Sequence, residues 1–413
     1  MCKYIKLFVL LILFSQLQSK TLTVGQNQMF SDLKTAVKIA VDYDTIIVFS
    51  GYYKLNKLNI NKPLTILGKN NPILDATNKS ELIVINSDSV TLKGFTLQNI
   101  PNNFTEDWAA IRLNKSRYCL IEDNHIYNSF FGIYLNRSLN CMIKHNKIIG
   151  KAKKEFDAGN AIHLWYSDNA LIENNYAGKH RDGIYLEFTK NSRIVFNTSE
   201  NNLRYGLHFM FCDNNVYKKN IFRFNGAGVA VMFSKNVNMH SNVFSDNIGS
   251  SSYGLLLKDI VDSKITKNII KNNTIGIHAD GASRCFIKNN EFSKNGWAIR
   301  ILGSSVNDTI FENNFFSNSF DISTNSTFNK NYYINNYWSK YTGYDLDKDG
   351  IGDIPYRPVK LFSYITANSK ESLILLRSFF VTLIEFAESI SPIFTPQNLI
   401  DNYPLMNPVK CWK

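Results

Sequence analysis

Asparagine recurs along most of this 413-residue chain at intervals that cluster near 22 residues. Nine asparagines share this spacing, with gaps of 22, 29, 22, 23, 22, 26, 22 and 24 residues: Asn124, Asn146, Asn175, Asn197, Asn220, Asn242, Asn268, Asn290 and Asn314. Each closes a short segment of alternating hydrophobic and polar residues, as in CLIEDN, CMIKHN and TIFENN. One turn-type residue at a fixed phase predicts a solenoid with one coil per repeat. Such a fold determines which side chains, distant in sequence, become neighbours.

A second series, of small residues, runs in step with the asparagines: Gly132, Ala161, Gly183, Gly206, Gly228, Gly254, Gly276 and Ala298. Both series shift together around residues 150–158 and 248–252, so we predict loop insertions there. The first, third and fifth positions after each small residue are mostly apolar, whereas the second and fourth vary. This alternation predicts a strand with one buried face and one solvent face.

Stacked coils of two or three short strands form a parallel β-helix, and we predict a right-handed one over residues 20–336. A left-handed helix of hexapeptides is disfavoured, because the sequence shows no six-residue period. About nine or ten coils are expected, stacked at about 4.8 Å. The asparagines are predicted to form a ladder of turns that adopts αL geometry and hydrogen-bonds from coil to coil.

The two ends depart from the repeat. Residues 1–19 combine an early basic stretch, the apolar run LFVLLILF and a polar QLQS, which predicts a secretory signal peptide and export to an oxidising compartment. The alternative, a membrane anchor, would need a longer apolar run. Residues 30–41 are expected to form a capping helix with Ser31 as its N-cap.

After the rod, residues 337–360 form an aromatic and acidic segment, and residues 361–413 form a predicted helical extension. The segment 369–388, with Ser369 as its cap, would be apolar over most of its circumference as a helix. It must therefore be covered. It either caps the far end of the rod or docks on a membrane-embedded partner.

The net charge of +12 could indicate a nucleic-acid partner. The lysines and arginines are, however, scattered through the predicted turns, and no basic stretch is interleaved with stacking aromatics. Nucleic-acid binding is not expected.

One outward column of the predicted sheet carries unusual chemistry. Reading four residues after each small residue gives Asn136, Trp165, Glu187, Met210, Met232, Lys258, Asp280 and Leu302. Met210 and Met232 should be neighbours, with His208 beside them and His163 farther along the adjacent column. Thioether and imidazole together favour Cu(I). The candidate copper contact surface is therefore His163, Glu187, His208, Met210 and Met232, and the alternative is an adaptable apolar patch for a protein partner.

Carboxylates offer a different function, because many β-helix proteins cleave polysaccharides with two or three matched acids. Glu187 and Asp280 share the outward column but lie four coils apart. An exported polysaccharide-binding or polysaccharide-cleaving protein therefore remains the alternative, with weak support.

The segment from Asp345 has acids at calcium-loop positions 1, 3, 5 and 9, with Gly350 at position 6: Asp345, Asp347, Asp349 and Asp353. Tyr356 stands at position 12 where an EF-hand needs glutamate, so a complete EF-hand is excluded. The loop is a candidate Ca²⁺ site or a tight acidic turn.

Cys119 and Cys141 hold the same inward phase one coil apart, which permits either a disulfide or two stacked buried thiols. The chain has no C-x-x-C pair, so neither a redox dithiol nor a zinc knuckle is indicated.

Longer strings carry a family resemblance. The segments GNAIHLWYSDNALIENN, KHRDGIYLEF, SENNLRYGLHFMF, NGAGVAVMFS, SSYGLLLK, NGWAIRI, NNYWSKYTGYDLDKDGIGDIPY and PLMNP resemble the NosD family of periplasmic β-helix proteins, which mature nitrous oxide reductase. The resemblance covers essentially the whole mature chain.

The resemblance implies a periplasmic assembly factor that is not an enzyme. It implies an ABC-type complex with a membrane subunit and a cytoplasmic ATPase, copper received transiently as Cu(I) from a lipoprotein copper chaperone, and nitrous oxide reductase as the target. It also favours docking of the 369–388 segment near the membrane subunit. Cys212, in FMFCDN, departs from the serine-like turn residue expected there and could add a thiolate to the copper surface.

Overall fold

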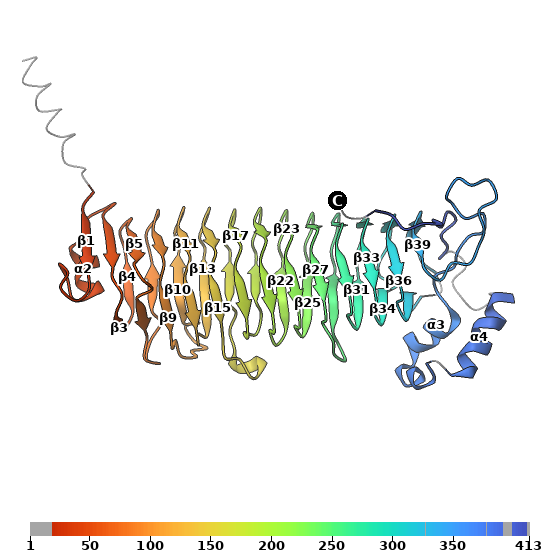
Figure 1. Cartoon of the computed structure of the whole chain (residues 1–413), viewed down its shortest axis with the longest axis horizontal. Helices are drawn as coiled ribbons and strands as arrows, with labels where there is room; N and C mark the ends of the chain where they lie inside the picture. The colour runs from red at the N-terminus through yellow and green to blue at the C-terminus, as the bar shows by residue number, and fades with distance from the viewer. Residues whose placement is uncertain (1–18, 327, 377, 391–398, 411–413) are drawn as a thin grey trace, which may run out of the picture.

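The chain folds into a straight rod of stacked coils with a small helical extension at one end (Figure 1). The computed structural model describes residues 19–326, 328–376, 378–390 and 399–410. The predicted signal peptide therefore lies almost entirely outside the described residues. Three sheets run along the rod, and each pairs strands of successive coils in parallel. The predicted parallel β-helix is confirmed.

Sheet A has 14 strands. They are β1 (Thr21–Val24), β2 (Thr45–Val48), β5 (Thr65–Gly68), β8 (Thr91–Lys93), β11 (Leu120–Glu122), β14 (Met142–Lys144), β17 (Leu171–Glu173), β20 (Arg193–Val195), β23 (Val216–Lys218), β26 (Asn238–His240), β29 (Lys264–Thr266), β32 (Phe286–Lys288), β35 (Thr309–Phe311) and β38 (Tyr332–Ile334).

Sheet B has 13 strands. They are β3 (Tyr52–Lys54), β6 (Ile73–Asp75), β9 (Thr96–Gln98), β12 (His125–Tyr127), β15 (Lys147–Ile149), β18 (Tyr176–Gly178), β21 (Thr198–Glu200), β24 (Ile221–Arg223), β27 (Val243–Ser245), β30 (Ile269–Lys271), β33 (Glu291–Ser293), β36 (Asn314–Phe316) and β39 (Tyr337–Trp338).

Sheet C has 12 strands and carries the series of small residues. They are β4 (Leu58–Ile60), β7 (Ile83–Ile85), β10 (Ala109–Asn114), β13 (Phe131–Asn136), β16 (Ile162–Trp165), β19 (Ile184–Glu187), β22 (Tyr205–Met210), β25 (Ala227–Met232), β28 (Tyr253–Lys258), β31 (Ile275–Asp280), β34 (Trp297–Ile301) and β37 (Phe320–Ser323).

The rod is longer than nine or ten coils, because sheet A alone has 14 strands. The early coils, up to about residue 100, stack in the same register but lack the asparagine that marks the later ones. Their interior is filled by aliphatic side chains such as Ile46, Ile66 and Leu92, all fully buried. The asparagine spacing therefore undercounted the coils.

The asparagine ladder is buried and hydrogen-bonded from coil to coil, as predicted. The Asn197 backbone N–H donates to Asn220 Oδ1 at 2.8 Å, and the Asn220 side-chain amide donates to Asn242 Oδ1 at 3.0 Å. The prediction that the asparagines themselves adopt αL geometry was wrong. The residue before each asparagine has the positive φ, for example Lys219 with φ 55°. The last assigned member was also wrong. Asn313 continues the ladder from Asn290, and Asn314 lies in β36.

A short helix, α2 (Leu33–Ile39), covers the first coils with Leu33, Ala36 and Val37 buried. Its N-cap is Asp32 and not Ser31. The Asp32 carboxylate accepts from the Thr35 backbone N–H at 2.9 Å, which satisfies one free donor of the first turn.

The segment 369–388 is not one helix. The extension comprises α3 (Leu361–Asn368), the 3₁₀ helix η2 (Lys370–Leu375) and α4 (Phe379–Ile390), and Ser369 is the junction between α3 and η2. Phe362 of α3 packs on Phe320 of β37, and Val381 of α4 joins the same cluster. The extension thus contacts the last coil, in agreement with the predicted alternative in which it caps the far end of the rod. None of the helices within the described residues combines the length and apolar character needed to cross a membrane.

The C-terminal tail returns along the rod and ends the asparagine ladder, which the sequence did not predict. Asp401 is fully buried, and its Oδ2 accepts from the Asn336 backbone N–H at 3.0 Å and from Trp338 Nε1 at 3.0 Å. The Asn314 side-chain amide donates to the Val409 carbonyl at 2.8 Å. A carboxylate therefore supplies the acceptor that a further asparagine would have supplied.

Candidate metal-contact surface

The predicted alignment of the methionines is confirmed. Met210 of β22 pairs in register with Met232 of β25, and Glu187 of β19 pairs with Met210. Neighbouring strands lie about 4.8 Å apart, so these three side chains occupy successive rungs of one column. All three are half-buried on the outer face of sheet C. Lys258 is the next rung after Met232 and bounds the group.

The predicted histidines lie closer to the interior than expected. His163 and His208 are only 8% and 5% exposed, although their strand phase is outward. Tyrosines cover them. Tyr185 stacks between the two rings, with centroids 4.8 Å from His163 and 4.6 Å from His208, and Tyr205 packs on His208 at 4.9 Å. His163 is therefore two coils from His208 and does not join Met210 in one site.

His208 sits against a buried ion pair. Asp182 is fully buried and receives two bonds from Arg204, Nε to Oδ1 at 2.9 Å and Nη2 to Oδ2 at 2.5 Å. His208 Nδ1 lies 3.8 Å from Asp182 Oδ2, and neither ring nitrogen of His208 has a hydrogen-bond partner. A metal-binding imidazole donates its second ring N–H to a carboxylate, and Asp182 lies on that side of His208, although 3.8 Å is too long for a hydrogen bond.

The protonation states suit ligand binding. Burial lowers the pKa of His163 to about 3 and also lowers that of His208, against the opposing effect of Asp182. Burial alone would raise the pKa of Asp182, but hydrogen bonds from Arg204 and the nearby His208 outweigh it and hold the pKa at about 2. At neutral pH the imidazoles are neutral and the carboxylate is charged, so one nitrogen of each ring carries no proton and has a lone pair for a cation.

Cys212 does not extend this surface. Its side chain is fully buried, and Sγ contacts the Leu186 and Met210 carbonyls at 3.3 and 3.2 Å. The Cys212 backbone N–H donates to Ser234 Oγ at 2.9 Å, and the Thr189 backbone N–H donates to Cys212 Sγ, so the thiol occupies an inward position between two hydroxyl residues. Burial raises its pKa to about 12, and a thiolate ligand is therefore ruled out at neutral pH.

The sequence analysis missed an aromatic strip beside the methionines, formed by the exposed Tyr166, Phe211 and Phe233 and the half-buried Phe188. Each directly follows a member of the outward column and has a positive φ of 47° to 55°. Their rings stack along the rod with centroids 4.6, 5.2 and 5.0 Å apart. Bulky residues rarely adopt this backbone geometry, so neither the turn nor the core requires aromatics here. The signal was visible in WY, EF, MF and MF at successive repeats.

The acidic pair considered for polysaccharide chemistry does not form. Met210, Met232 and Lys258 lie in register between Glu187 and Asp280. Four strand spacings amount to about 19 Å, twice the largest separation used by glycosidase carboxylates.

The acidic loop is closed by its own backbone. Asp345 accepts from the Lys348 and Gly350 backbone N–H groups at 2.7 and 2.9 Å, and Asp353 accepts from the Leu346 N–H at 2.7 Å. Oxygens of Asp345, Asp347 and Asp349 nevertheless lie within 4.8 Å of one another. Both alternatives remain compatible with this geometry, so Ca²⁺ binding stays a prediction.

Cys119 and Cys141 are free and buried. Each thiol contacts a backbone carbonyl two residues earlier, at 3.6 Å for Cys119 and 3.4 Å for Cys141. The structure thus has stacked thiols, the second of the two predicted arrangements.

Comparison with known proteins gives a consistent result. Residues 146–343 match the family model described as periplasmic copper-binding protein (NosD). The chain is 28% identical over 366 residues to the probable ABC transporter binding protein NosD of Pseudomonas aeruginosa, covering 84% of this chain and 85% of that protein. It is 24% identical over 377 residues to the protein of the same name from Stutzerimonas stutzeri, covering 86% and 85%.

Solved structures show the same fold. The A-module of mannuronan C-5 epimerase AlgE6 from Azotobacter vinelandii matches with a TM-score of 0.52 at 12% identity, covering 74% of this chain and 89% of that module. At this level of identity the likeness extends to the β-helix alone.

Proposed function

We propose that this chain, which is similar to the NosD proteins, is a periplasmic, non-catalytic assembly factor that handles Cu(I). It works with the membrane subunit and cytoplasmic ATPase of an ABC-type transporter. It receives copper from a lipoprotein chaperone and serves the copper centres of nitrous oxide reductase. The family match and the relatives' names support the copper and transporter parts of this proposal.

The pairing of Met210 with Met232 is the observation that carries the copper proposal. Two thioethers one strand spacing apart, on an outer face, form a soft ligand pair that selects Cu(I) over harder ions. Both side chains are partly accessible, as cargo exchanged between proteins requires. Glu187, on the preceding rung, supplies the negative charge that partly neutralises a bound cation.

His208 is the third ligand in this proposal. It lies two residues before Met210 on β22, with Asp182 Oδ2 3.8 Å from Nδ1 and no hydrogen-bond partner at either ring nitrogen. Because Tyr185 and Tyr205 cover its ring, copper reaches the methionines first, and His208 joins when the tyrosines shift. His163 lies outside this group and serves the stack of rings.

A Cu(I) titration against a competing chelator tests the assignment. The double variant Met210→Leu with Met232→Leu keeps the side-chain volume and removes both sulfurs. We expect it to weaken Cu(I) binding by at least about tenfold, or about 1.4 kcal/mol. Met142→Leu is the matched control, because Met142 is also a half-buried strand residue, on sheet A. Equal affinity in the double variant and the control would refute the site.

The helical extension supports a membrane-subunit partner. Six large apolar side chains in the described part of η2 and α4 are exposed: Ile374, Leu375, Phe379, Phe380, Leu383 and Phe386. α3 attaches the extension to the rod through Phe362, so the remaining face of α4 is available to a partner.

Co-purification with the membrane subunit and ATPase tests this docking. Phe379→Ser with Leu383→Ser should abolish recovery of the complex while leaving the far-ultraviolet spectrum of the rod unchanged. Phe156→Ser is the control, since Phe156 is 75% exposed on a distant loop. Full recovery of the complex with the first variant would place the docking surface elsewhere.

A further inference from the structure

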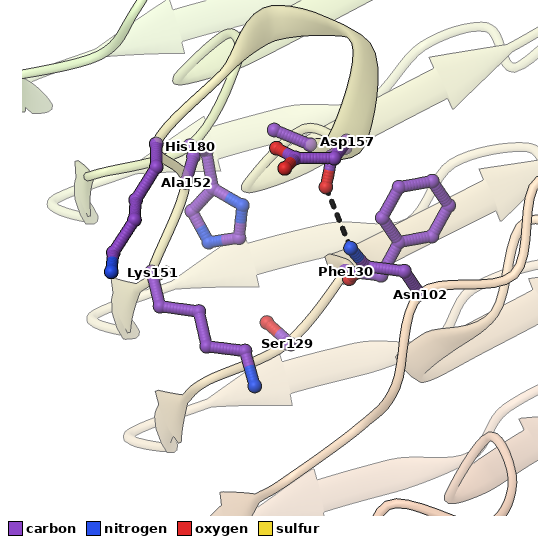
Figure 2. A pocket seen from close by; sticks show the side chains of 10 residues that line it. Asn102, Ser129, Phe130, Lys151, Ala152, Asp157 and His180 are labelled. Atoms are coloured by element: carbon purple, nitrogen blue, oxygen red, sulfur yellow. Dashed lines mark hydrogen bonds between the residues drawn. The ribbon is translucent and has the colours of Figure 1, made fainter.

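A pocket of about 230 Å³ opens at the corner between sheets B and C (Figure 2). Loop residues 99–108 and 150–161 meet there, and the Asn102 side-chain amide joins them by donating to the Asp157 carbonyl at 2.7 Å. The polar residues that line it are Asn102, Ser129, Lys151, Lys153, Asp157 and His180. A cavity of this size has room for roughly eight water molecules at about 30 Å³ each, and therefore for a small organic ligand.

The pocket forms where a second asparagine ladder stops. This ladder follows the strands of sheet B and comprises Asn202, Asn225, Asn247, Asn273, Asn295 and Asn318. The register of β12, β15, β18 and β21 places Ser129, Lys151 and His180 at the equivalent position of the preceding coils. His180 is the end of the ladder, since its backbone N–H donates to Asn202 Oδ1 at 3.1 Å.

The replacements leave buried polar atoms without partners. Ser129 and His180 are 5% and 1% exposed, and neither Ser129 Oγ nor His180 Nε2 has a hydrogen bond. An unmet buried donor or acceptor costs about 1–3 kcal/mol. Asparagine satisfies the same position in six other coils, so these two residues are retained at a cost in stability.

The charges around the opening favour an anion. Lys151 and Lys153 are exposed and form no ion pair with any other described residue. Figure 2 shows the Lys151 side chain extending along the pocket on the side of Ser129, with the His180 ring farther along. Asp157 is the one acid in the lining. Burial lowers the pKa of His180 to about 4, so its ring is neutral at pH 7 and offers one donor and one acceptor.

We propose that this pocket binds a small hydroxylated anion whose carboxylate or phosphate group contacts Lys151, Lys153 and Ser129. The two ammonium groups supply charge-assisted hydrogen bonds. Asp157 faces the same space and accepts from the ligand's hydroxyl, which selects against a bare oxyanion. The ligand supplies hydrogen-bond partners for His180 Nε2 and Ser129 Oγ, which have none within the coils. The site is separate from the copper surface and does not depend on it.

Isothermal titration calorimetry of the full chain with inorganic phosphate, malate and succinate tests the proposal. Malate and succinate differ by one hydroxyl, so malate is expected to bind more tightly if Asp157 accepts a hydrogen bond from that hydroxyl. Lys151→Gln with Lys153→Gln should weaken binding by about tenfold or more. Lys154→Gln with Lys115→Gln removes the same charge from exposed residues outside the lining and should leave the affinity unchanged.

His180→Asn gives a second measurement that does not endanger folding, because asparagine is the residue of this column in the next coils. We expect the variant to unfold at the same or a higher temperature and to bind the anion more weakly. Absence of binding for all three probes would overturn the proposal. Equal losses in the lining and control lysine variants would overturn it as well, since they would indicate attraction by the net charge of +12 alone. Preference for inorganic phosphate over malate would contradict the selection for a hydroxylated ligand by Asp157.

Discussion

Replacing Asp308 by asparagine should stabilise the rod at neutral pH. Asp308 is 1% exposed and occupies an inward ladder, where its Oδ1 accepts from the Cys285 backbone N–H at 2.7 Å. Its own N–H donates to Asn331 Oδ1 at 2.8 Å, while Oδ2 has no partner. Burial raises the pKa of Asp308 to about 6 from an ordinary value of 3.8, because the ionised form lacks water and a counterion.

The size and pH window of the effect follow from linkage. A raised pKa means that the folded state holds the proton more tightly, so wild-type stability falls as pH rises from about 4 to 6. At pH 7 the loss is about 3 kcal/mol, since each pKa unit corresponds to 1.36 kcal/mol. Asparagine keeps the acceptor, carries no charge and avoids this loss. Its advantage should therefore vanish near pH 4.

Thermal unfolding followed by circular dichroism at pH 4, 5, 6 and 7 measures the difference. The melting temperature of Asp308→Asn should match wild type at pH 4 and exceed it increasingly up to pH 6 or 7. Asp262→Asn is the control. Asp262 is exposed, and hydrogen bonds from Arg284 lower its pKa, so no gain is expected. A melting difference that is constant across pH, or a destabilised variant at pH 7, would refute the reasoning.

Three further outcomes are expected. Asp401→Ala should lower the free energy of unfolding by about 3 kcal/mol in denaturant titrations, because Asn336 N–H and Trp338 Nε1 lose their buried acceptor. A loss below about 0.5 kcal/mol would mean that water replaces the carboxylate. Cys212→Ser should leave both the melting temperature and the Cu(I) affinity unchanged, since a hydroxyl suits the inward ladder; weakened Cu(I) binding would return the thiol to the metal surface. Addition of Ca²⁺ should raise the melting temperature if the loop from Asp345 binds it, and an unchanged curve with Ca²⁺ and with EGTA would establish a turn closed by backbone bonds alone.

The register of the rod was predictable because parallel coils repeat one physical constraint. Each buried asparagine must find an acceptor in the next coil, so an insertion shifts every ladder together. That constraint placed Met210 beside Met232 correctly from 22 residues away. It could not count the early coils, where aliphatic residues fill the interior without any polar marker. The repeat also could not predict the role of Asp401, because the C-terminal tail passes the rod once and has no repeating pattern.

Exposure was the property that the repeat did not determine. The position of a residue in its strand determines which face of sheet C its side chain lies on. It does not determine whether neighbouring side chains on that face cover it. The His208 side chain lies on the outer face but is only 5% exposed, because Tyr185 and Tyr205 are large enough to enclose it. Met210 lies on the same strand and stays half-buried, since Glu187 and Met232 are its lateral neighbours. The thioethers and the imidazole therefore differ in access, and in the proposed copper site only His208 requires a movement of the tyrosines before it can bind.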